Sequence, residues 1–506
     1  MAYVAIISRL LLIVVLSALF GRGPEQAQFI YFNDSAPDVM ILGNDHYEIA
    51  LNKWNGAIRY ITDKATGQHV SDGSDCVWGA VFYDQTTDYE GGCLYGASAS
   101  KRFAYAWSAA SSQLTLTYTG DPGSSYRVNV QVVITASPQS WFDMQMTVDN
   151  RWRYELDDVI FPSHLMLARS DIREALAPTL PGVMLTEPFF GAQRSYIADY
   201  PNLFADFQWV SSTKGQLGLY SLYDQVQIRP VSIGYFSFAD HPETVLLDHS
   251  FHARVPVGQT WSSPKVRLRV GQNLTSVIGD YRSDNGLDAF PSLRARLGAR
   301  YGQVAQSPIL KLGMTDFLPR RFAEFPNLLA DLPSPAILHL VSYWQYGFDE
   351  NYPDLLPPDP RLGTTADLAA RVRTLQGRGF LPRLYSNPTW WDDESPTFRQ
   401  LDPANVVLYE APGVPRYECY THSAGPPACS VENARRDSAF NQSHPYEMLH
   451  GGYVVSPWAP LVRERLNQQI AELTEQVPND ILIQDQVGAR SNYTDYGPFA
   501  PTATSY

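Results

Sequence analysis

Charged residues are scarce in this sequence: they make up 18% of its 506 residues, against about 25% in typical soluble domains. Basic residues are the rarer kind, since 38 lysines and arginines stand against 52 aspartates and glutamates and leave a formal net charge of −14. Such a chain repels the phosphate backbone of a nucleic acid and an anionic membrane surface. Nucleic acid is therefore not expected as a partner. The length is sufficient for two or three domains.

The signature motifs of several enzyme classes are missing. There is no GxSxG, no GxxxxGK[ST], no GxGxxG and no HExxH, which argues against serine hydrolases, P-loop enzymes, dinucleotide enzymes and zincins. His249 and His252 have the spacing H-x-x-H, but they lie in an alternating apolar stretch and are interpreted as strand residues. A metal site at this pair is not expected.

Long apolar runs are confined to the N-terminus. Leu10–Phe20 is unbroken, follows Arg9 and precedes the small or turn-forming residues Gly21–Pro24. This arrangement is typical of a secretory signal peptide, assigned here to residues 1–27. The alternative is an uncleaved membrane anchor, for which the run falls short of about 20 apolar residues. We expect a secreted or extracellular protein with no stable membrane insertion after cleavage.

Cysteine is rare, with four in the chain. They form two local pairs, Cys76 with Cys93 and Cys419 with Cys429, whose spacings match no zinc pattern. In an oxidising compartment such pairs close, so we predict two short-loop disulfides. Asn-X-Ser/Thr sequons fit the same secretory route, and they stand at Asn33, Asn273, Asn441 and Asn492.

Residues 28–272 are expected to form an all-β domain, a large sandwich. Apolar and polar residues alternate with period two along several stretches, and turn residues separate them. Asn55-Gly56, between two such stretches, is a strong hairpin signal. The predicted strands include Tyr47–Leu51, Ala57–Ile61, Leu114–Tyr118, Val128–Ile134, Phe142–Val148 and Val266–Val270.

Helical signals follow in residues 273–307, a predicted helical linker, and residues 308–506 then alternate apolar strands with amphipathic helices. One helix is predicted to have Thr365 as its cap and to end at Gly377. A second is predicted to have Ser456 as its cap and Pro457 at its first position. The predicted strands are Ile309–Met314, Ala336–Tyr343, Phe380–Tyr385 and Ile481–Gln484.

These βα units predict part of a (β/α)8 barrel. A complete barrel needs eight strands and around 250 residues, and four strands are counted before the polar, turn-rich stretch 491–506. Either the fold is a smaller α/β layer, or the sequence is the first half of a longer barrel protein. The second is preferred, because half a barrel leaves a hydrophobic sheet edge open.

Polar and aromatic side chains collect at the carboxyl ends of these strands, where barrel enzymes have their sites. The fourth strand runs directly into Asp485. Aromatic residues make up 13% of the chain, and aromatic faces combined with carboxylates and amides are typical of sugar sites. The candidate substrate-binding residues are Asp316, Trp344, Tyr346, Asp349, Tyr385, Asn387, Trp390, Trp391, Asp392 and Arg490.

Structural roles remain open for these residues. Ordinary core or loop packing would equally explain Trp344, Trp390 and Trp391. A helix or turn cap after the strand would explain Asp485.

The second half of the chain nevertheless resembles a known enzyme family, through Tyr352-Pro353, the stretch Gly379–Asn387 and above all Ile483–Ala489. It is similar to the retaining glycoside hydrolases that include α-galactosidases and endo-α-N-acetylgalactosaminidases, and most of all to uncharacterised glycosidase-like proteins related to them. The stretch Gly56–Gly67 is similar to the sandwich domains of those enzymes.

This resemblance implies that Asp485 is the nucleophile of a double displacement and that the partner is an oligosaccharide, polysaccharide or glycoconjugate. It also implies that no metal and no organic cofactor is needed. In the family the acid/base comes from a later strand, which this sequence lacks, so no residue is assigned that role. Asp316, Asp349, Asp392 and Asp393 fit hydroxyl ligands better. Arg490 would orient Asp485 or hold a substrate oxygen.

Two other hypotheses remain. One is a catalytically inactive carbohydrate-binding or structural remnant of such an enzyme, which differs from the glycosidase by one carboxylate. The other is a polysaccharide lyase built on the β domain, which needs a Tyr or His base near a charge-neutralising group. The sequence shows no constellation of that kind.

Overall fold

The computed structural model describes residues 29–74, 76–84, 87–89, 101–120, 128–179, 182–199, 203–223, 231–237, 241–314, 321–421, 429–434, 449–487, 490 and 495–500. The predicted signal peptide lies outside these residues, as do Cys93, Asp316, Asn441 and Asn492. The chain divides into two compact units: the first comprises the described residues up to Asn285, and the second comprises those from Gly286 onward. Each unit has its own buried core.

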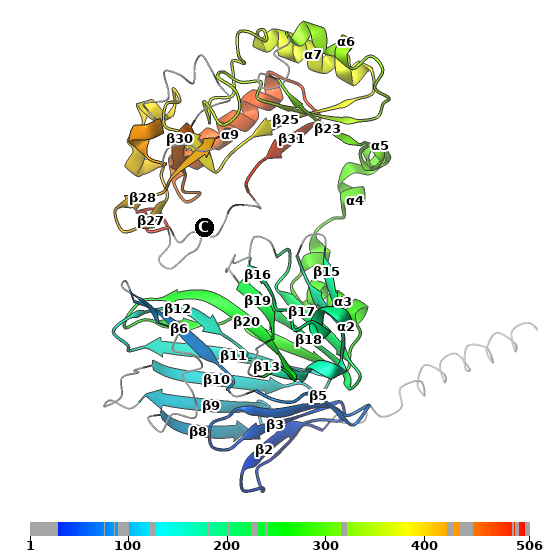
Figure 1. Ribbon diagram of the computed structural model, residues 1–506, viewed down its shortest axis with the longest axis vertical. Coiled ribbons are helices and arrows are strands. Elements are labelled where there is room, and N and C mark those ends of the chain that lie inside the picture. The colour runs from blue at the N-terminus through cyan, green and yellow to red at the C-terminus, as the bar shows by residue number, and fades with distance from the viewer. Residues whose placement is uncertain are drawn as a thin grey trace, which may run out of the picture. The chain divides into compact units, whose positions relative to one another are not determined.

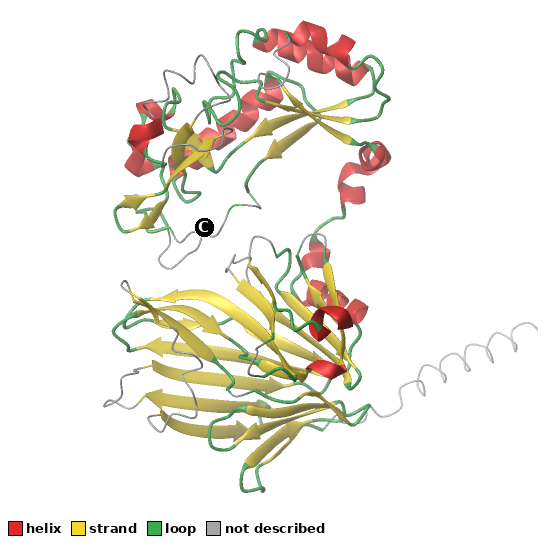
Figure 2. Cartoon of the chain, in the orientation of Figure 1, coloured by secondary structure: helices red, strands yellow, loops and turns green. Residues whose placement is uncertain are grey.

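The first unit is built from three antiparallel sheets (Figures 1 and 2). A ten-stranded sheet has the order β15-β14-β17-β18-β22-β11-β10-β9-β8, with β21 paired to β11. Its strands are β8 (Lys101–Ser108), β9 (Gln113–Gly120), β10 (Val128–Ala136), β11 (Trp141–Asn150), β14 (Ile172–Ala177), β15 (Val183–Thr186), β17 (Phe207–Ser212), β18 (Gly215–Leu222), β21 (Thr260–Ser262) and β22 (Lys265–Val270).

Two smaller sheets complete this unit. A seven-stranded sheet has the order β16-β19-β20-β12-β6-β7, with β13 paired to β20, and a five-stranded sheet runs from β1 to β5 in sequence order. Their strands are β1 (Tyr31–Asn33), β2 (Val39–Gly43), β3 (Tyr47–Asn52), β4 (Ile58–Asp63), β5 (Gln68–Ser71), β6 (Gly79–Asp84), β7 (Thr87–Tyr89), β12 (Glu155–Ile160), β13 (Leu165–Ala168), β16 (Tyr196–Asp199), β19 (Val231–Phe236) and β20 (Thr244–Val255).

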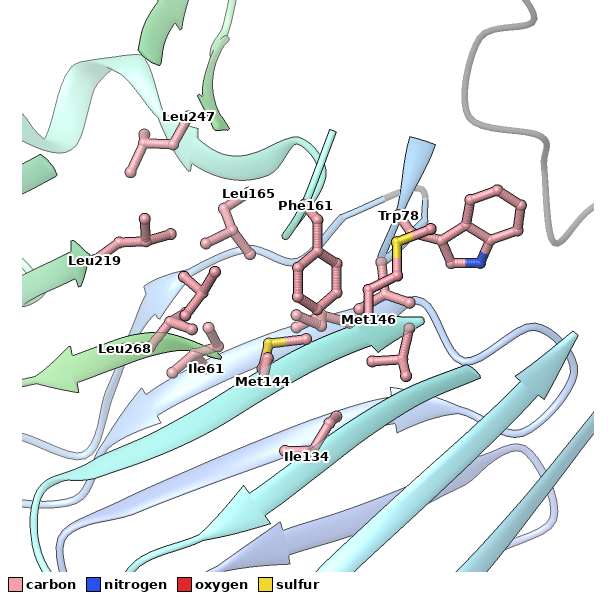
Figure 3. Close-up of a cluster of buried hydrophobic side chains, with 14 of the residues drawn as sticks. Ile61, Trp78, Ile134, Met144, Met146, Phe161, Leu165, Leu219, Leu247 and Leu268 are labelled. Atoms are coloured by element: carbon pink, nitrogen blue, oxygen red, sulfur yellow. The ribbon is translucent and has the colours of Figure 1, made fainter. Parts of the chain in front are cut away.

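One hydrophobic core joins the three sheets. Ile61 of β4, Ile134 of β10, Leu268 of β22, Leu165 of β13 and Leu247 of β20 all belong to the same buried cluster (Figure 3). Burial alternates along strands such as β9 and β10, as period-two patterning requires. The unit is therefore a β-sandwich, and the predicted strands within it are confirmed.

Two local features follow the sequence closely. The predicted hairpin is formed by β3 and β4, with Gly56 at a φ of +71° in a connection longer than Asn-Gly alone. His249 and His252 lie on β20, which confirms their interpretation as strand residues. His249 Nε2 lies 2.6 Å from Asp206 Oδ1 in the buried interior, which explains how a polar strand residue is tolerated there.

The first unit also contains the short helices η1 (Arg169–Asp171) and α2 (Glu187–Gly191), which lie between its strands, and α3 (Leu274–Asp284), which follows its last strand. The helices η2 (Leu287–Ala289), α4 (Leu293–Leu297), η3 (Gly298–Arg300) and α5 (Tyr301–Gln306) come next in the chain. Asn273 caps α3 by accepting a hydrogen bond from the Ser276 N–H at 3.0 Å. Val277 of α3 packs with Phe207 and Tyr220 of the sandwich. The first helix of the predicted linker is thus part of the β-rich unit.

The second unit contains a four-stranded parallel sheet in the order β23-β24-β25-β31. The strands are β23 (Ile309–Gly313), β24 (Ile337–Val341), β25 (Leu381–Ser386) and β31 (Ile481–Gln484), which confirms all four strand predictions. The helices that accompany it are η4 (Phe322–Glu324), α6 (Phe325–Leu328), α7 (Thr365–Gly377), η5 (Phe398–Gln400), η6 (Pro403–Asn405) and α9 (Pro460–Glu475). The chain therefore combines a β-sandwich with an α/β domain.

The starts of two helices differ from prediction. Thr364, not Thr365, caps α7: its hydroxyl accepts from the Asp367 N–H at 3.2 Å, and the Asp367 carboxylate accepts from the Thr364 N–H at 2.9 Å. The prediction that Ser456 and Pro457 open the last helix is wrong, because α9 begins at Pro460. Ser456 instead donates its hydroxyl to the buried Asp495.

An antiparallel insertion, which the sequence patterns did not predict, lies between β25 and α9. Three of its strands form a sheet in the order β26-β30-β29, and two others form a hairpin. They are β26 (Trp390–Asp392), β27 (Tyr409–Ala411), β28 (Val414–Pro415), β29 (Tyr417–Thr421) and β30 (Leu449–Val454). The predicted disulfide between Cys419 of β29 and Cys429 is confirmed. No helix in the described part of the chain is both long and apolar enough to cross a bilayer.

Candidate active site

The carboxyl ends of the parallel strands bring Asp485 beside the end of β25. Asp485 follows β31 directly, and its N–H donates to the carbonyl of Ser386, the last residue of β25, at 2.8 Å. The parallel register of β25 and β31 therefore sets the position of the Asp485 backbone. This edge is where α/β domains place their ligands.

Two donors hold the Asp485 carboxylate. The Tyr385 hydroxyl donates to Oδ2 at 2.7 Å, and the Gln486 N–H donates to Oδ1 at 2.9 Å. Burial, followed by the neighbouring carboxylate, raises the pKa of Tyr385, so this hydroxyl remains a donor at neutral pH. Asp485 itself is half-buried, and it is the accessible carboxylate around which the rest of the site is arranged.

An aromatic cluster lies behind Tyr385. Trp344 stacks on Tyr385 with ring centroids 5.4 Å apart, and Tyr352 contacts Trp344 at 5.3 Å and Trp390 at 5.8 Å. Trp344, Trp390 and Trp391 are fully buried. A stacking platform for a sugar needs an exposed ring face, so these indoles act as packing in this structure. Phe348, which is partly exposed and lies 5.6 Å from Tyr385, is the aromatic residue that sequence patterning missed.

The loop after β24 has an unusual backbone. Ser342, Tyr346, Asp349 and Asn351 all have positive φ angles, between +57° and +70°, as does Gln486 after β31. Such conformations are costly for residues other than glycine and collect at functional sites. The sequence offered no signal for them, because none of these residues is a glycine.

The other acidic candidates are buried and engaged. Glu350, missed in the sequence analysis, contacts Nδ1 of His450 and hydrogen-bonds Asp392. Burial raises the pKa of Glu350 to about 8, so this carboxyl is mostly protonated at neutral pH. Burial and the adjacent Glu350 also raise the pKa of Asp392. Since two such close carboxyls cannot both ionise, this pair holds at least one proton.

Asp392 and Asn387 serve the local backbone. Asp392 accepts from the N–H groups of Asn351 at 2.7 Å and Glu394 at 2.8 Å. Asn387 Oδ1 accepts from the N–H and the hydroxyl of Thr389. Both side chains therefore shape the loops around the site. Asp349 and Asp393 are also buried, with Asp393 Oδ2 3.2 Å from the Tyr417 hydroxyl.

Arg490 does not contact Asp485. Its guanidinium donates to Glu418 Oε2 at 2.6 Å, to Thr389 Oγ1 at 3.0 Å and to the Tyr420 hydroxyl at 3.2 Å. Arg490 is 8% exposed. It therefore links the segment after β31 to the inserted sheet and to the loop after β25.

A basic row crosses the sheet below the site. Lys311, His339 and Arg383 are aligned in register on β23, β24 and β25. Arg383 Nε donates to His339 Nδ1 at 3.1 Å, which places the imidazole proton on Nε2. Burial, then Arg383 and Lys311, lowers the pKa of His339 to about 4. Sequence patterning missed this row because strand register is a tertiary property.

Comparison with solved structures identifies the architecture. The α-N-acetylgalactosaminidase NagBb from Bifidobacterium bifidum in complex with Gal-NHAc-DNJ has a TM-score of 0.65 and 13% identity, over 92% of this chain and 72% of that protein. Its complex with GalNAc also has a TM-score of 0.65, with 14% identity and the same coverage. The chain has a glycoside-hydrolase-like fold. The GH36 α-galactosidase AgaB from Geobacillus stearothermophilus has a TM-score of 0.44 and 9% identity, over 90% and 65% of the two chains. No protein-family model and no curated protein sequence matches the chain.

Within this glycoside-hydrolase-like fold, the structure brings together Asp485, Tyr385 and Phe348 at one strand edge, with the buried indoles behind them. The described residues contain no group of three or more His, Cys, Asp or Glu side chains arranged to hold a metal ion. The side chains brought together at this edge are a carboxylate, a phenol and apolar rings.

Proposed function

We propose that this protein is a glycoside hydrolase that cleaves an O-glycosidic bond with retention, with Asp485 as its nucleophile. The observation that carries the proposal is the Asp485 carboxylate, half-buried at the carboxyl end of β31 and oriented by the Tyr385 hydroxyl at 2.7 Å. A nucleophile must be both reachable and held in one direction. Asp485 meets both requirements, whereas Asp349 and Asp392 are buried.

The reaction proposed is a double displacement. An Asp485 oxygen attacks the anomeric carbon and displaces the leaving oxygen, which takes a proton from a second carboxylic acid about 5 to 5.5 Å away. Water, deprotonated by that same group, then releases the sugar and frees Asp485. We assign this acid/base to no described residue, because Glu350, whose pKa is raised, is buried and in contact with His450.

The substrate class proposed is an α-linked galactose or N-acetylgalactosamine unit. The support is the name of a structurally similar protein, an α-N-acetylgalactosaminidase observed with GalNAc, together with the sequence motif around Asp485. We also propose that the four parallel strands are the first half of a (β/α)8 barrel, and that residues 1–27 direct secretion. The four-stranded parallel order and its accompanying helices support the first of these statements.

Turnover of an activated glycoside tests the assignment. The full chain is incubated with p-nitrophenyl α-N-acetylgalactosaminide and with the α-galactoside, and nitrophenol release is recorded. Asp485→Asn is expected to reduce turnover to background because the carboxylate oxygen that attacks is lost, while Asp402→Asn, at an exposed helix cap, is expected to retain it. Normal activity of the Asp485→Asn protein would disprove the nucleophile.

A second outcome is binding without turnover. If the unmodified protein binds N-acetylgalactosamine in calorimetry yet releases no nitrophenol, the carbohydrate-binding alternative replaces the enzyme. That alternative is favoured by the absence of an assignable acid/base among the described carboxyls.

A further inference from the structure

The inserted sheet is connected to Asp485 by a continuous chain of hydrogen bonds. Glu418 of β29 accepts from the Arg490 guanidinium at 2.6 Å. The Arg490 N–H in turn donates to the carbonyl of Gln486 at 3.0 Å, and the Gln486 N–H donates to Asp485 Oδ1 at 2.9 Å. Four residues thus link a strand of the insertion to the carboxylate proposed as nucleophile.

The link acts on a strained residue. Gln486 has a φ of +66°, a conformation that is unfavourable for a non-glycine residue and persists only where its surroundings hold it. Its N–H and its carbonyl are both used in the chain just described. Release of Arg490 would therefore let Gln486 relax and would change the direction of the Asp485 carboxylate.

The ion pair between Glu418 and Arg490 is largely buried, and other residues also bond to it. Burial favours a raised pKa for Glu418, but Arg490, Tyr420 and Arg416 outweigh it and lower the pKa of this carboxyl. The Arg490 guanidinium also donates to the hydroxyl of Thr389, which directly precedes Trp390 of β26. Strand β29 and the loop after β25 therefore both hold this guanidinium. A direct substrate role fits poorly, since Arg490 is 8% exposed and its donors are engaged.

We propose that Arg490 and Glu418 are positioning residues, through which the inserted sheet β26-β30-β29 holds the Asp485 carboxylate in the direction needed for attack. The inference rests on the proposed function of Asp485. It assigns the insertion a role in reactivity that is distinct from substrate contact.

Glu418→Gln is the principal test, because it keeps the side-chain shape and removes the charge. Glu410→Gln is the matched control: Glu410, on β27 of the neighbouring hairpin, accepts from Arg416 at 2.6 Å, whereas the Arg490 guanidinium donates to Glu418, Thr389 and Tyr420. We expect Glu418→Gln to lower kcat by about 10- to 100-fold with KM within about twofold of the unmodified protein, since misdirected groups lose rate more than binding. Arg490→Lys keeps the positive charge but loses the planar guanidinium that donates to several partners at once. This variant should show a smaller loss of kcat.

Hydrogen exchange gives a second readout that needs no turnover. The amide of Gln486 should exchange faster in Glu418→Gln than in the unmodified protein or in Glu410→Gln, while amides of the sandwich remain unchanged and confirm folding. If Glu418→Gln does not fold, Thr389→Val removes another partner of Arg490 and tests the same prediction.

The two proposals fail differently. An unmodified protein that turns over no glycoside removes the proposed function, yet faster exchange at Gln486 in Glu418→Gln still supports the link. Unchanged hydrogen exchange at the Gln486 amide in Glu418→Gln overturns the link. If the unmodified protein is active, an unchanged kcat in Glu418→Gln overturns it as well. A kcat loss of equal size in Glu410→Gln also overturns it.

Discussion

At the residue scale, acidic side chains of similar sequence context have opposite roles. Asp485 and Asp392 each follow a strand or lie at its end, yet Asp485 is half-buried with two donors and Asp392 is buried beside another carboxyl. The difference arises because Asp485 lies beyond the sheet edge, whereas Asp392 is enclosed by β26 and the loop around Glu350. Reactivity therefore depends on the surroundings of each carboxyl and cannot be assigned by residue type.

The buried Glu350 makes stability depend on pH. Its folded pKa of about 8 exceeds the unfolded value of 4.5, so the folded state binds more protons between these values and stability falls as pH rises through that range. We expect Glu350→Gln, which cannot ionise, to remove a decrease on the order of a few kcal/mol between about pH 5 and about pH 8. Urea unfolding at several pH values measures it. Glu464→Gln, at an exposed position on α9, should retain the slope, and an unchanged slope in Glu350→Gln would contradict the prediction.

His339 should behave in the opposite way. Because burial, Arg383 and Lys311 lower its pKa to about 4, below the unfolded value of 6.5, stability contributed by this group rises with pH from about 4 to about 6.5. NMR titration should find His339 neutral at pH 6, and Arg383→Gln should move its pKa upward. Arg373→Gln, on the exposed side of α7, serves as the control. An unshifted His339 in the Arg383→Gln protein would refute the role of this cation.

At the element scale, a one-residue difference in capping separates prediction from structure. Both Thr364 and Thr365 precede the apolar face of α7, but the capping box uses Thr364 and Asp367. The distinction arises because the cap residue must have extended backbone, and Thr364 has φ −92° and ψ 168°. The effect of each threonine on stability can therefore be separated by mutation.

We expect Thr364→Ala to destabilise the α/β unit by about 1 kcal/mol, since one helix N–H loses its acceptor. Thr365→Ala, one position into the helix, should be nearly neutral because alanine is the better helix former. Chemical unfolding of both variants measures the difference. A larger loss in Thr365→Ala would show that the cap is one residue later.

At the scale of the whole molecule, two separate cores determine unfolding. Leu268 belongs to the sandwich core and Leu340 to the core of the α/β unit, and both are buried. Units with independent cores unfold independently unless their interface is large. Two transitions are therefore expected in calorimetry.

Truncating one buried leucine in each unit shows which unfolding transition belongs to which unit. Leu268→Ala should lower one and Leu340→Ala the other, each by the equivalent of about 2 to 5 kcal/mol, because a cavity replaces buried methyl groups. If both variants shift the same single transition, the units fold as one cooperative body.

Local patterns were sufficient for most of the fold. Period-two alternation located strands such as β10 and β11, and apolar runs located β23, β24, β25 and β31, because which face a residue buries depends on its neighbours in sequence. The sequence also predicted the position of Asp485 directly after β31, since this position depends on where one strand ends. The sequence did not predict the antiparallel insertion, because its short strands pair across long sequence separations.

The arrangement around Asp485 required the folded chain. Tyr385 reaches Asp485 across a separation of 100 residues, and Glu418 reaches Arg490 across 72. Neither pair has a sequence signature, since hydrogen bonds between distant residues form only once strand order and register are set. Burial of the indoles and the proton on Glu350 have the same origin: solvent exclusion belongs to the packed interior, whereas residue identity and local periodicity are already present in the unfolded chain.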